Sequence, residues 1–329
     1  MPGKMDEFTV HQAVLPLAQV ASDDPHWQDR LYFNLHGQDG AFLAITGMGA
    51  FPNRGTMEGY LLAVHRGRHY ASFVSRPLAG DREEMTAGGL SFAVVEPLRS
   101  WRLQLTPEGG RVRGHLLFEA RCPAYDFETI RWQKGEATVV HQCHYTQAGR
   151  YLGVLEVDGQ ALEGLMGMRD RSWGIRNLAQ VDMWLWASVQ LPDACITAWQ
   201  WETAAGERIY CDGALVREDG QVRRIVSLAH RLELWPASRR HRRTRLALRL
   251  EDGQELELLA EEVASVYLGR QPSEWSDDDE ETRHQADAAA LGYDQLCHFR
   301  GEGVEGWGVL EFALVGGYRP YGIAPARLG

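Results

Sequence analysis

The residues best suited to chemistry lie in one stretch at the middle of the chain, Gly167-Met168-Arg169-Asp170-Arg171-Ser172-Trp173-Gly174-Ile175-Arg176. The arginines are expected to hold the Asp170 carboxyl ionised, and a guanidinium group can bind a carboxylate through two parallel hydrogen bonds. Two interpretations follow. In the first, Arg171, Trp173 and Arg176 form a structural junction that joins two halves of the protein. In the second, Asp170 faces a pocket and takes part in a reaction.

Carboxyl groups near aromatic residues are the other candidates for acid–base chemistry. A carboxyl buried in a dry pocket has a raised pKa and can donate a proton near neutrality. The arginines beside Asp170 should lower its pKa, which favours a carboxylate base or an ion pair over a general acid. His36, on the less apolar face of its predicted strand, is a candidate proton shuttle. Each candidate is also compatible with an ordinary position in a strand. The candidate catalytic residues are Asp170, Glu58, Glu202, Glu311 and His36.

The histidines do not have the spacing of a zinc site. His141, His144 and His298 lack the His-Glu-x-x-His arrangement, and His141 and His144 differ in strand parity, so they should point to opposite faces. The sequence also lacks a phosphate-binding GxxxxGK[ST] loop, a Rossmann fingerprint and a GxSxG elbow. We therefore expect chemistry that uses neither a metal nor a cofactor.

Tryptophans gather in one predicted hairpin, with strands at 183–189 and 195–201. A loop centred on Pro192-Asp193 places each tryptophan of one strand opposite a tryptophan of the other, so that all the indoles share one face of the sheet. They form either the core of a barrel or a wall for an apolar or cationic ligand. With two tyrosines on nearby strands, the candidate ligand-binding residues are Trp184, Trp186, Trp199, Trp201, Tyr60 and Tyr210.

Short strands separated by turns run through most of the chain. The segment 30–36, for example, alternates Leu31, Phe33 and Leu35 with polar or aromatic residues, the period of two expected of a strand. Many such strands predict an all-β protein of sandwich or barrel type, with a short surface helix between 272 and 291. We place a domain boundary after the central stretch, giving domains at 1–178 and 179–329.

Composition narrows the classes of function. The 329 residues carry a net charge of −11, which disfavours binding to nucleic acid. The five cysteines form no CxxC pair, so we expect neither a disulfide framework nor a zinc site, and a cytoplasmic location fits. The stretch 1–8 has no apolar region of a signal peptide, and no apolar run is long enough to span a membrane. The expected partner is a hydrophobic small molecule.

The motif Gly-x-Arg-Asp-Arg-Ser-Trp-Gly-x-Arg at 167–176 resembles the central motif of two-domain lipocalin-like (calycin) proteins. These include carotenoid 1,2-hydratase, AttH-type proteins, and lipocalin-like terpene cyclases and Diels–Alderases. The segments 23–33, 51–55 and 305–312 resemble the same group. The resemblance implies two antiparallel barrels side by side with an apolar ligand between or within them. It transfers no catalytic residue, because the branches of the group differ in their acids.

Three hypotheses of function follow. The first is a cofactor-free cyclase, hydratase or isomerase that acts on an apolar isoprenoid or polyene-like substrate by acid–base catalysis in an aromatic-lined pocket. The second is a lipocalin-like carrier that binds such a molecule without changing it, and the third is an interaction scaffold without an enclosed pocket. A buried carboxyl within reach of the ligand would distinguish the first hypothesis from the second.

Overall fold

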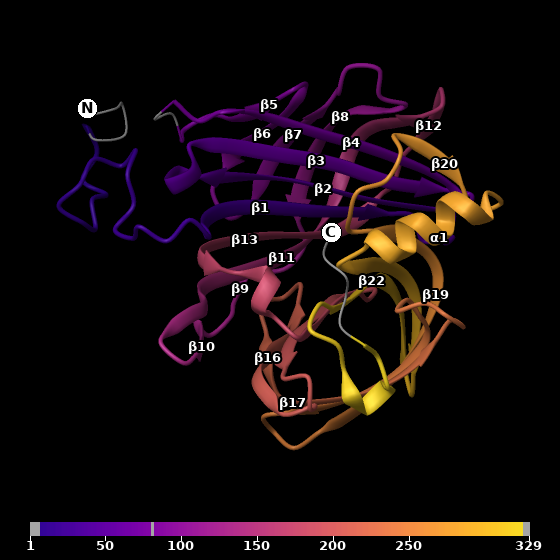
Figure 1. Ribbon diagram of the computed structural model, residues 1–329. Coiled ribbons are helices and arrows are strands. Elements are labelled where there is room, and N and C mark those ends of the chain that lie inside the picture. Colours follow the sequence, from indigo (N-terminus) through magenta and orange to yellow (C-terminus); the bar gives the residue numbers. More distant parts are fainter. Residues whose placement is uncertain (1–6, 80–81, 325–329) are drawn as a thin grey trace.

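The computed structural model describes residues 7–79 and 82–324, and nearly all of its regular structure is β-strand. Within these residues the strands form two bodies, a curved 14-stranded sheet and a closed barrel, which lie against each other (Figure 1). The all-β fold class with few short helices is confirmed.

The curved sheet comes from the first half of the chain with one late addition, β20. Its strands follow the order β20-β4-β3-β2-β1-β13-β11-β8-β7-β6-β5, and β9, β10 and β12 pair with β11. The bounds are β1 (Trp27–His36), β2 (Phe42–Phe51), β3 (Thr56–His65), β4 (Arg68–Pro77), β5 (Met85–Ala87), β6 (Leu90–Glu96), β7 (Ser100–Leu105), β8 (Val112–Ala120), β9 (Tyr125–Asp126), β10 (Ile130–Lys134), β11 (Ala137–Val157), β12 (Gln160–Leu162), β13 (Met166–Arg176) and β20 (Glu274–Ser276).

The barrel follows in the second half and closes where its first strand pairs with its last. Its strands are β14 (Met183–Gln190), β15 (Ala194–Glu202), β16 (Arg208–Arg217), β17 (Val222–Leu234), β18 (His241–Leu250), β19 (Glu255–Tyr267), β21 (Gly292–Gly301) and β22 (Val304–Leu314). The helical segments are η2 (Pro52–Arg54), η3 (Leu178–Gln180), α1 (Glu280–Ala289) and η4 (Arg319–Tyr321). In the described part of the chain, no helix has the length and apolarity that crossing a membrane requires.

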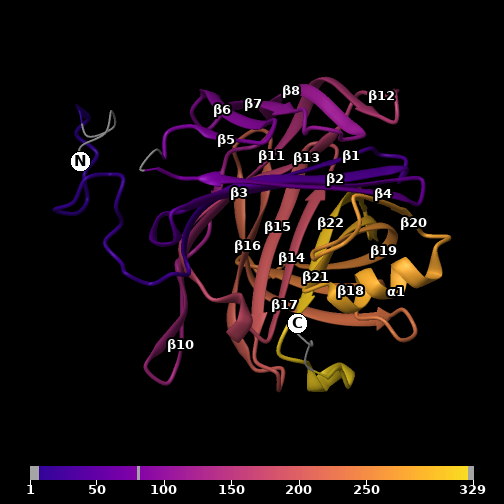
Figure 2. The same cartoon turned by 45° about the horizontal axis from the view of Figure 1, so that its top comes forward.

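Strand alternation separates three apolar layers. On β1, one face packs in the core of the curved sheet with Leu31 and Phe33, while Tyr32 and Asn34 on the other face point at the barrel. On β14, Leu185 lies inside the barrel, whereas the outward tryptophans pack against the curved sheet. The third layer is therefore apolar packing between the two bodies, whose strands lie against each other in Figure 2, and both faces of β1 are largely buried.

The predicted tryptophan register is confirmed, with Trp186 opposite Trp199 and Trp184 opposite Trp201. The indoles share the outer face of the barrel, so they belong to the interface and not to the barrel core. The predicted helix is confirmed as α1, which Asp279 caps by accepting a hydrogen bond from the backbone N–H of Thr282.

Two segments differ from the sequence-based expectation. Residues 121–140, where the alternation is lost, contain the short strands β9 and β10. The sequence pattern predicts a strand only from Phe299 onward, whereas the barrel strand β21 begins seven residues earlier, at Gly292. The predicted boundary between 1–178 and 179–329 falls between β13 and β14, although β20 from the second half extends the first sheet. The division into two domains stays a prediction.

Arg121 connects the curved sheet to the barrel. Its side chain is only 3% exposed and forms an ion pair with Glu218, with 2.7 Å between Nε and the carboxylate oxygen. It also donates hydrogen bonds to the Gln190 side chain and to the backbone carbonyls of Leu191 and Pro192. All these partners belong to the β14–β15–β16 region of the barrel. Arg121 therefore has the junction role that the sequence suggested for Arg171, Trp173 and Arg176.

Candidate functional site

A cavity of about 220 Å³ lies between the curved sheet and the barrel. One wall comes from β1, β3 and β13 of the sheet, and the other comes from β14, β21 and β22 of the barrel. Its apolar lining combines aromatic and aliphatic side chains, and its polar lining combines arginine, tyrosine and carboxyl groups, a composition typical of ligand sites. The lining residues are Arg30, Tyr32, Tyr60, Leu62, Phe73, Asp170, Ser172, Arg176, Leu178, Trp184, Trp186, Leu268, Gly269, Leu291, Asp294 and Glu311.

On the sheet side, strand register brings three polar side chains into one row. Tyr60 on β3 lies opposite Gly47 on β2, Gly47 lies opposite Tyr32 on β1, and Tyr32 lies opposite Asp170 on β13. Residues paired in this way across neighbouring strands point to the same face. Gly47 has no side chain and so leaves room for the Tyr60 ring over β2, which lets Tyr60 lie next to Tyr32 and Asp170 in the row.

Replacing Gly47 by alanine should disturb this row. A Cβ at this position would lie 2.5 Å from the backbone oxygen of Leu31 and 3.1 Å from the Tyr60 hydroxyl. We expect a loss of about 1–3 kcal/mol in unfolding free energy, as for other overpacked sites, together with weaker ligand binding. Chemical denaturation and ligand titration would measure both effects. The control is Gly59→Ala, whose Cβ approaches nothing closer than 3.0 Å and meets the Met48 side chain first; an equal loss of binding there would contradict the role of Gly47.

On the barrel side, two carboxyl groups lie next to each other. Asp294 on β21 is the direct cross-strand partner of Glu311 on β22, and Glu311 is in turn the partner of Trp186 on β14. The Tyr32 hydroxyl donates a hydrogen bond of 2.8 Å to Oδ2 of Asp294 across the interface. The indole N–H of Trp184 donates a bond of the same length to Oε1 of Glu311. Both carboxyl groups are thus oriented by groups that surround the cavity.

Burial favours the protonated form of the carboxyl pair. Burial raises the pKa of Asp294 well above its usual range, and the charge of Glu311 raises it further. Burial also raises the pKa of Glu311, although Arg176 and the Trp184 hydrogen bond oppose this shift. Burial and the Asp294 charge keep the Tyr32 hydroxyl protonated by raising its pKa. Since Tyr32 donates to Oδ2, the proton of Asp294 is free to sit on Oδ1.

Asp170 closes the polar end of the cavity beside a buried histidine. Its Oδ2 lies 3.4 Å from Nε2 of His144, and its side chain is 19% exposed. The His144 ring stacks on Phe127 with 4.8 Å between ring centroids. This packing fixes the imidazole against Asp170, so a carboxylate with an adjacent histidine stands on the opposite wall from the Asp294–Glu311 pair.

Several buried polar atoms around the cavity have no hydrogen-bond partner in the described chain. They include Nε of Arg176, Nε1 of Trp186 and Oδ1 of Asp294. A buried polar atom without a partner costs about 1–3 kcal/mol. All three atoms belong to residues that line the cavity, so a bound ligand with an oxygen substituent is a candidate partner for them.

Two predicted catalytic glutamates lie outside the cavity. The Glu58 side chain is 45% exposed and pairs with Arg54 at 3.3 Å in an outer groove. Glu202 points into the barrel, where it accepts hydrogen bonds from Tyr318 and from the His230 ring. Burial acts to raise the pKa of Glu202, but these bonds outweigh it and the pKa is lowered. Neither environment is that of a carboxyl acid next to the cavity.

His36 does not line the cavity either. It is fully buried on the barrel-facing side of β1, and its Nδ1 lies 3.0 Å from the backbone oxygen of Gly37. Burial lowers its pKa to about 4, so the imidazole is neutral at physiological pH. The structure therefore gives it no route for shuttling protons to the Asp294–Glu311 pair.

The aromatic residues divide into a lining layer and a supporting layer. Trp184, Trp186 and Tyr60 line the cavity. Trp201 stacks behind Trp184 with 5.7 Å between ring centroids. Trp199 packs edge-on against the Phe127 and His144 rings and against Tyr210, and the Tyr210 hydroxyl donates to the backbone oxygen of Glu128. Of the four tryptophans predicted to form a wall, Trp184 and Trp186 line the cavity, and Trp199 and Trp201 pack behind them.

The predicted junction residues lie in different surroundings. Arg171 pairs with Asp29 at 2.8 Å and donates to the backbone of Arg30, so its contacts stay within the curved sheet. Trp173 is 39% exposed and meets the Tyr145 ring, also within the sheet. These placements differ from the expected junction because the side chains point away from the barrel. Arg176 does face the barrel, but as part of the cavity lining.

Asp294, Tyr32 and Arg30 line the cavity but were not among the site residues predicted from the sequence. A signal for Asp294 was present, because a two-residue turn at Glu302-Gly303 pairs Gly301 with Val304 and, counted backwards, Asp294 with Glu311. Tyr32 and Arg30 share the parity of His36 on β1, which had been recognised as the less apolar face. That face turned out to be the one directed at the second body.

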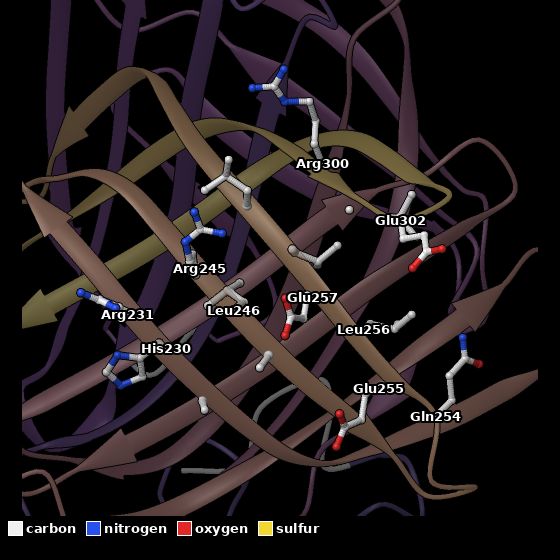
Figure 3. Close-up of a pocket in the computed structure, with 16 residues that line it drawn as sticks. His230, Arg231, Arg245, Leu246, Gln254, Glu255, Leu256, Glu257, Arg300 and Glu302 are labelled. Carbon is white, nitrogen blue, oxygen red and sulfur yellow. The ribbon is translucent and has the colours of Figure 1, made fainter.

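A larger groove of about 670 Å³ runs over strands β17, β18 and β19 of the barrel. Figure 3 shows its charged side chains spread over the surface, from Arg231 on one side to Glu302 on the other. They do not point toward a common centre, unlike the groups around the interface cavity. We therefore place the functional site in the smaller cavity between sheet and barrel.

The chain has the fold of lipocalin-like proteins, the fold that the resemblance of the central motif implied. An AttH-like protein from Nitrosomonas europaea is similar with a TM-score of 0.61 and 14% identity over 89% of this chain and 94% of that chain. CghA, solved with Sch210972, is similar with a TM-score of 0.56 and 13% identity, covering 88% of this chain and 89% of that chain. Kievitone hydratase from Nectria haematococca is similar with a TM-score of 0.55 and 11% identity, covering 87% of this chain and 88% of that chain. The chain belongs to the family of unknown function DUF8625, whose model matches residues 3–324. A search of curated protein sequences finds no match.

Proposed function

We propose that the protein is a hydratase, cyclase or isomerase that protonates an alkene of an apolar, isoprenoid- or polyene-like substrate. The observation that supports this most is the Asp294–Glu311 carboxyl pair, whose pKa values are raised by burial in a cavity with aromatic and aliphatic side chains in its lining. A carboxyl kept neutral by its surroundings is the type of general acid that works near neutral pH.

The reaction begins when Oδ1 of protonated Asp294 donates its proton to one carbon of the double bond. The two π electrons form the new C–H bond and leave a carbocation on the other carbon. The indole faces of Trp184 and Trp186 stabilise this cation, and the Glu311 carboxylate opposite Trp186 adds electrostatic stabilisation. The apolar side chains around the cavity limit the access of bulk water to the cation.

The second step decides between the reaction types. After ring closure or a double-bond shift, the cation loses a proton to the Asp294 carboxylate, which restores the pair. In a hydration, a water oxygen attacks the cation and a carboxylate takes the surplus proton. Asp170, on the opposite wall beside His144, is the residue placed to act as that base.

The structurally similar proteins support this proposal through their shared fold and through what their names state. One of them is named a hydratase, and another was solved with a bound small molecule. The alternative is a carrier that binds the same kind of ligand without changing it. The unpartnered donors at Arg176 and Trp186 are compatible with a carrier, whereas the raised pKa of the carboxyl pair favours the enzyme.

Ligand binding can be followed through the indoles of the wall. Titration with farnesol, a linear isoprenoid with three double bonds, should quench tryptophan fluorescence saturably, and Trp186→Phe should remove at least about half of the quenching, since Trp186 faces the ligand. The matched control is Trp307→Phe, because Trp307 stacks on His298 and lines a different groove.

Native mass spectrometry and product analysis complete the test. A co-purified apolar molecule, or conversion of an added polyene to a hydrated or cyclised product, is the expected result. Saturable binding with no conversion of any bound polyene would favour the carrier. Equal quenching in the parent, Trp186→Phe and Trp307→Phe proteins would place the binding site elsewhere.

A further inference from the structure

Two guanidinium groups meet where the interface cavity opens into an outer groove. Arg30 and Arg176 line both the cavity of about 220 Å³ and an adjoining groove of about 470 Å³. Their strand positions explain this, since Arg30 lies opposite Ser172 on β13 and Arg176 follows four residues later on the same face of that strand. The two spaces therefore share a cationic opening.

Neither arginine forms a salt bridge with a carboxylate, although the charges of Glu311 and Asp170 act on Arg176 from a greater distance. The closest polar contact of Arg30 is a long hydrogen bond of 3.4 Å from Nη1 to Oε1 of Gln28. Arg176 has a buried Nε without any partner, and its guanidinium lies 5.8 Å from the centroid of the Trp184 ring. Within residues 7–79 and 82–324, no carboxylate oxygen comes within 4.0 Å of either guanidinium group.

This arrangement is unfavourable for the protein alone. Burial, together with the neighbouring charge of Arg30, lowers the pKa of Arg176 to about 10, although Glu311 and Asp170 oppose this shift. Buried charges are ordinarily paired, because the loss of hydration is otherwise not compensated. By contrast, the nearby Arg54 has both an acidic partner, Glu58, and the face of the Phe51 ring at 3.9 Å.

The cavity consequently has two chemically different ends. The opening carries the positive charges of Arg30 and Arg176, and the barrel wall carries the Asp294–Glu311 pair, whose pKa values are raised. Trp184 belongs to both regions, since it contacts Glu311 through its N–H and Arg176 through its ring face. A ligand that spans the cavity must match a cation at one end and a proton donor at the other.

We propose that Arg30 and Arg176 bind an anionic oxygen group, a carboxylate or an ionised enol, at one end of the substrate. The substrate class is then an unsaturated apolar acid whose double bond lies over Trp184 and Trp186 toward Asp294. This assignment builds on the proposed function and specifies its substrate. Planar guanidinium groups suit the two oxygens of such an anion, and the anion would supply the partner that Nε of Arg176 lacks.

The test compares three ten-carbon probes that share one carbon chain: geranic acid, its methyl ester and geraniol. Binding is measured by tryptophan quenching and by calorimetry with the parent protein. We expect geranic acid to bind about 10-fold or more tightly than the ester, as for a hydrogen bond to a charged group. Arg30→Gln and Arg176→Gln should each remove most of this preference while ester binding stays within about 3-fold of the parent value.

The control is Arg54→Gln, which removes a positive charge from the outer groove but not from the cavity. It should keep the preference for the acid. Equal affinity of the parent for acid and ester would overturn the anion site and leave the proposed reaction standing. A preference that disappears only in Arg54→Gln would move the anion to the outer groove and also overturn the assignment. If none of the probes gives saturable quenching, both the anion site and the apolar binding in the proposed function are contradicted.

Discussion

Replacing Asp294 by asparagine should slow substrate conversion by about 10²–10⁴-fold, the usual contribution of a general acid, while the protein remains at least as stable as the parent. Asparagine keeps the size of the side chain and can still accept the Tyr32 hydrogen bond at its amide oxygen. It cannot supply a proton, so binding should persist and turnover should fall. A substitution that only damaged the fold would lower both.

The stability of this variant should depend on pH in a defined direction. The pKa of Asp294 is raised in the folded protein, so the folded state retains a proton that the unfolded chain loses above its ordinary pKa of about 3.9. The parent therefore loses stability as pH rises from about 4 toward the raised pKa of the pair. The asparagine variant lacks this loss, so its melting temperature should exceed that of the parent at pH 8 and the difference should shrink toward pH 4.

The matched control is Asp212→Asn, which alters another buried aspartate. Asp212 accepts hydrogen bonds of 2.7 Å from the Tyr125 hydroxyl and from the backbone N–H of Glu128, and it pairs with Arg224. We expect the opposite pattern there, with lower stability and unchanged turnover per folded molecule. Full activity in Asp294→Asn would exclude Asp294 as the proton donor, and an equal stability profile in parent and variant would contradict its raised pKa.

Replacing Arg121 by alanine should lower the unfolding free energy by about 3 kcal/mol, the lower end of the range for breaking a buried ion pair. The lower end applies because Glu218 is 39% exposed and can regain water. The loss also leaves the acceptors at Gln190, Leu191 and Pro192 without their donor. Arg121 links sheet to barrel, so the effect should appear in the unfolding of both.

Denaturant unfolding, followed by fluorescence and by circular dichroism, measures this effect. Arg99→Ala is the control, since Arg99 is 72% exposed and pairs with the exposed Glu96, a type of pair that contributes about 0–1 kcal/mol. If Arg121→Ala and Arg99→Ala lower the unfolding free energy by the same small amount, Arg121 does not hold the sheet to the barrel, and the apolar layer alone stabilises the interface.

The sequence predicted elements whose register is set locally. The turn at Pro192-Asp193 was enough to align the tryptophans, and strand parity was enough to separate His141 from His144, of which only His144 is buried. These predictions needed no knowledge of the second body. Parity says which residues share a face, and a turn says which residues lie opposite each other.

The candidate site was harder to predict because it depends on which face meets the barrel. On β1, both faces are buried, so the more polar face with Tyr32 and Asn34 resembles a solvent face in sequence. The same ambiguity affected Arg171 and Trp173, whose neighbours on β13 point the other way. Asp294 was missed for another reason: the predicted strand began only at Phe299, so the register set by the Glu302-Gly303 turn was not extended back to Asp294.

The strand β20 affects how the chain can be divided. Its residues Glu274 to Ser276 pair with β4, the last strand of the curved sheet, and Trp275 stacks on His69 with 3.8 Å between ring centroids. Without β20, the outer edge of β4 would expose free backbone donors and acceptors, a template for aggregation. A fragment ending at the boundary after β13 would also expose the apolar surface that normally meets the barrel. Truncated versions of this protein are therefore poor reagents, and expression or crystallisation work should use a chain that extends at least through β22.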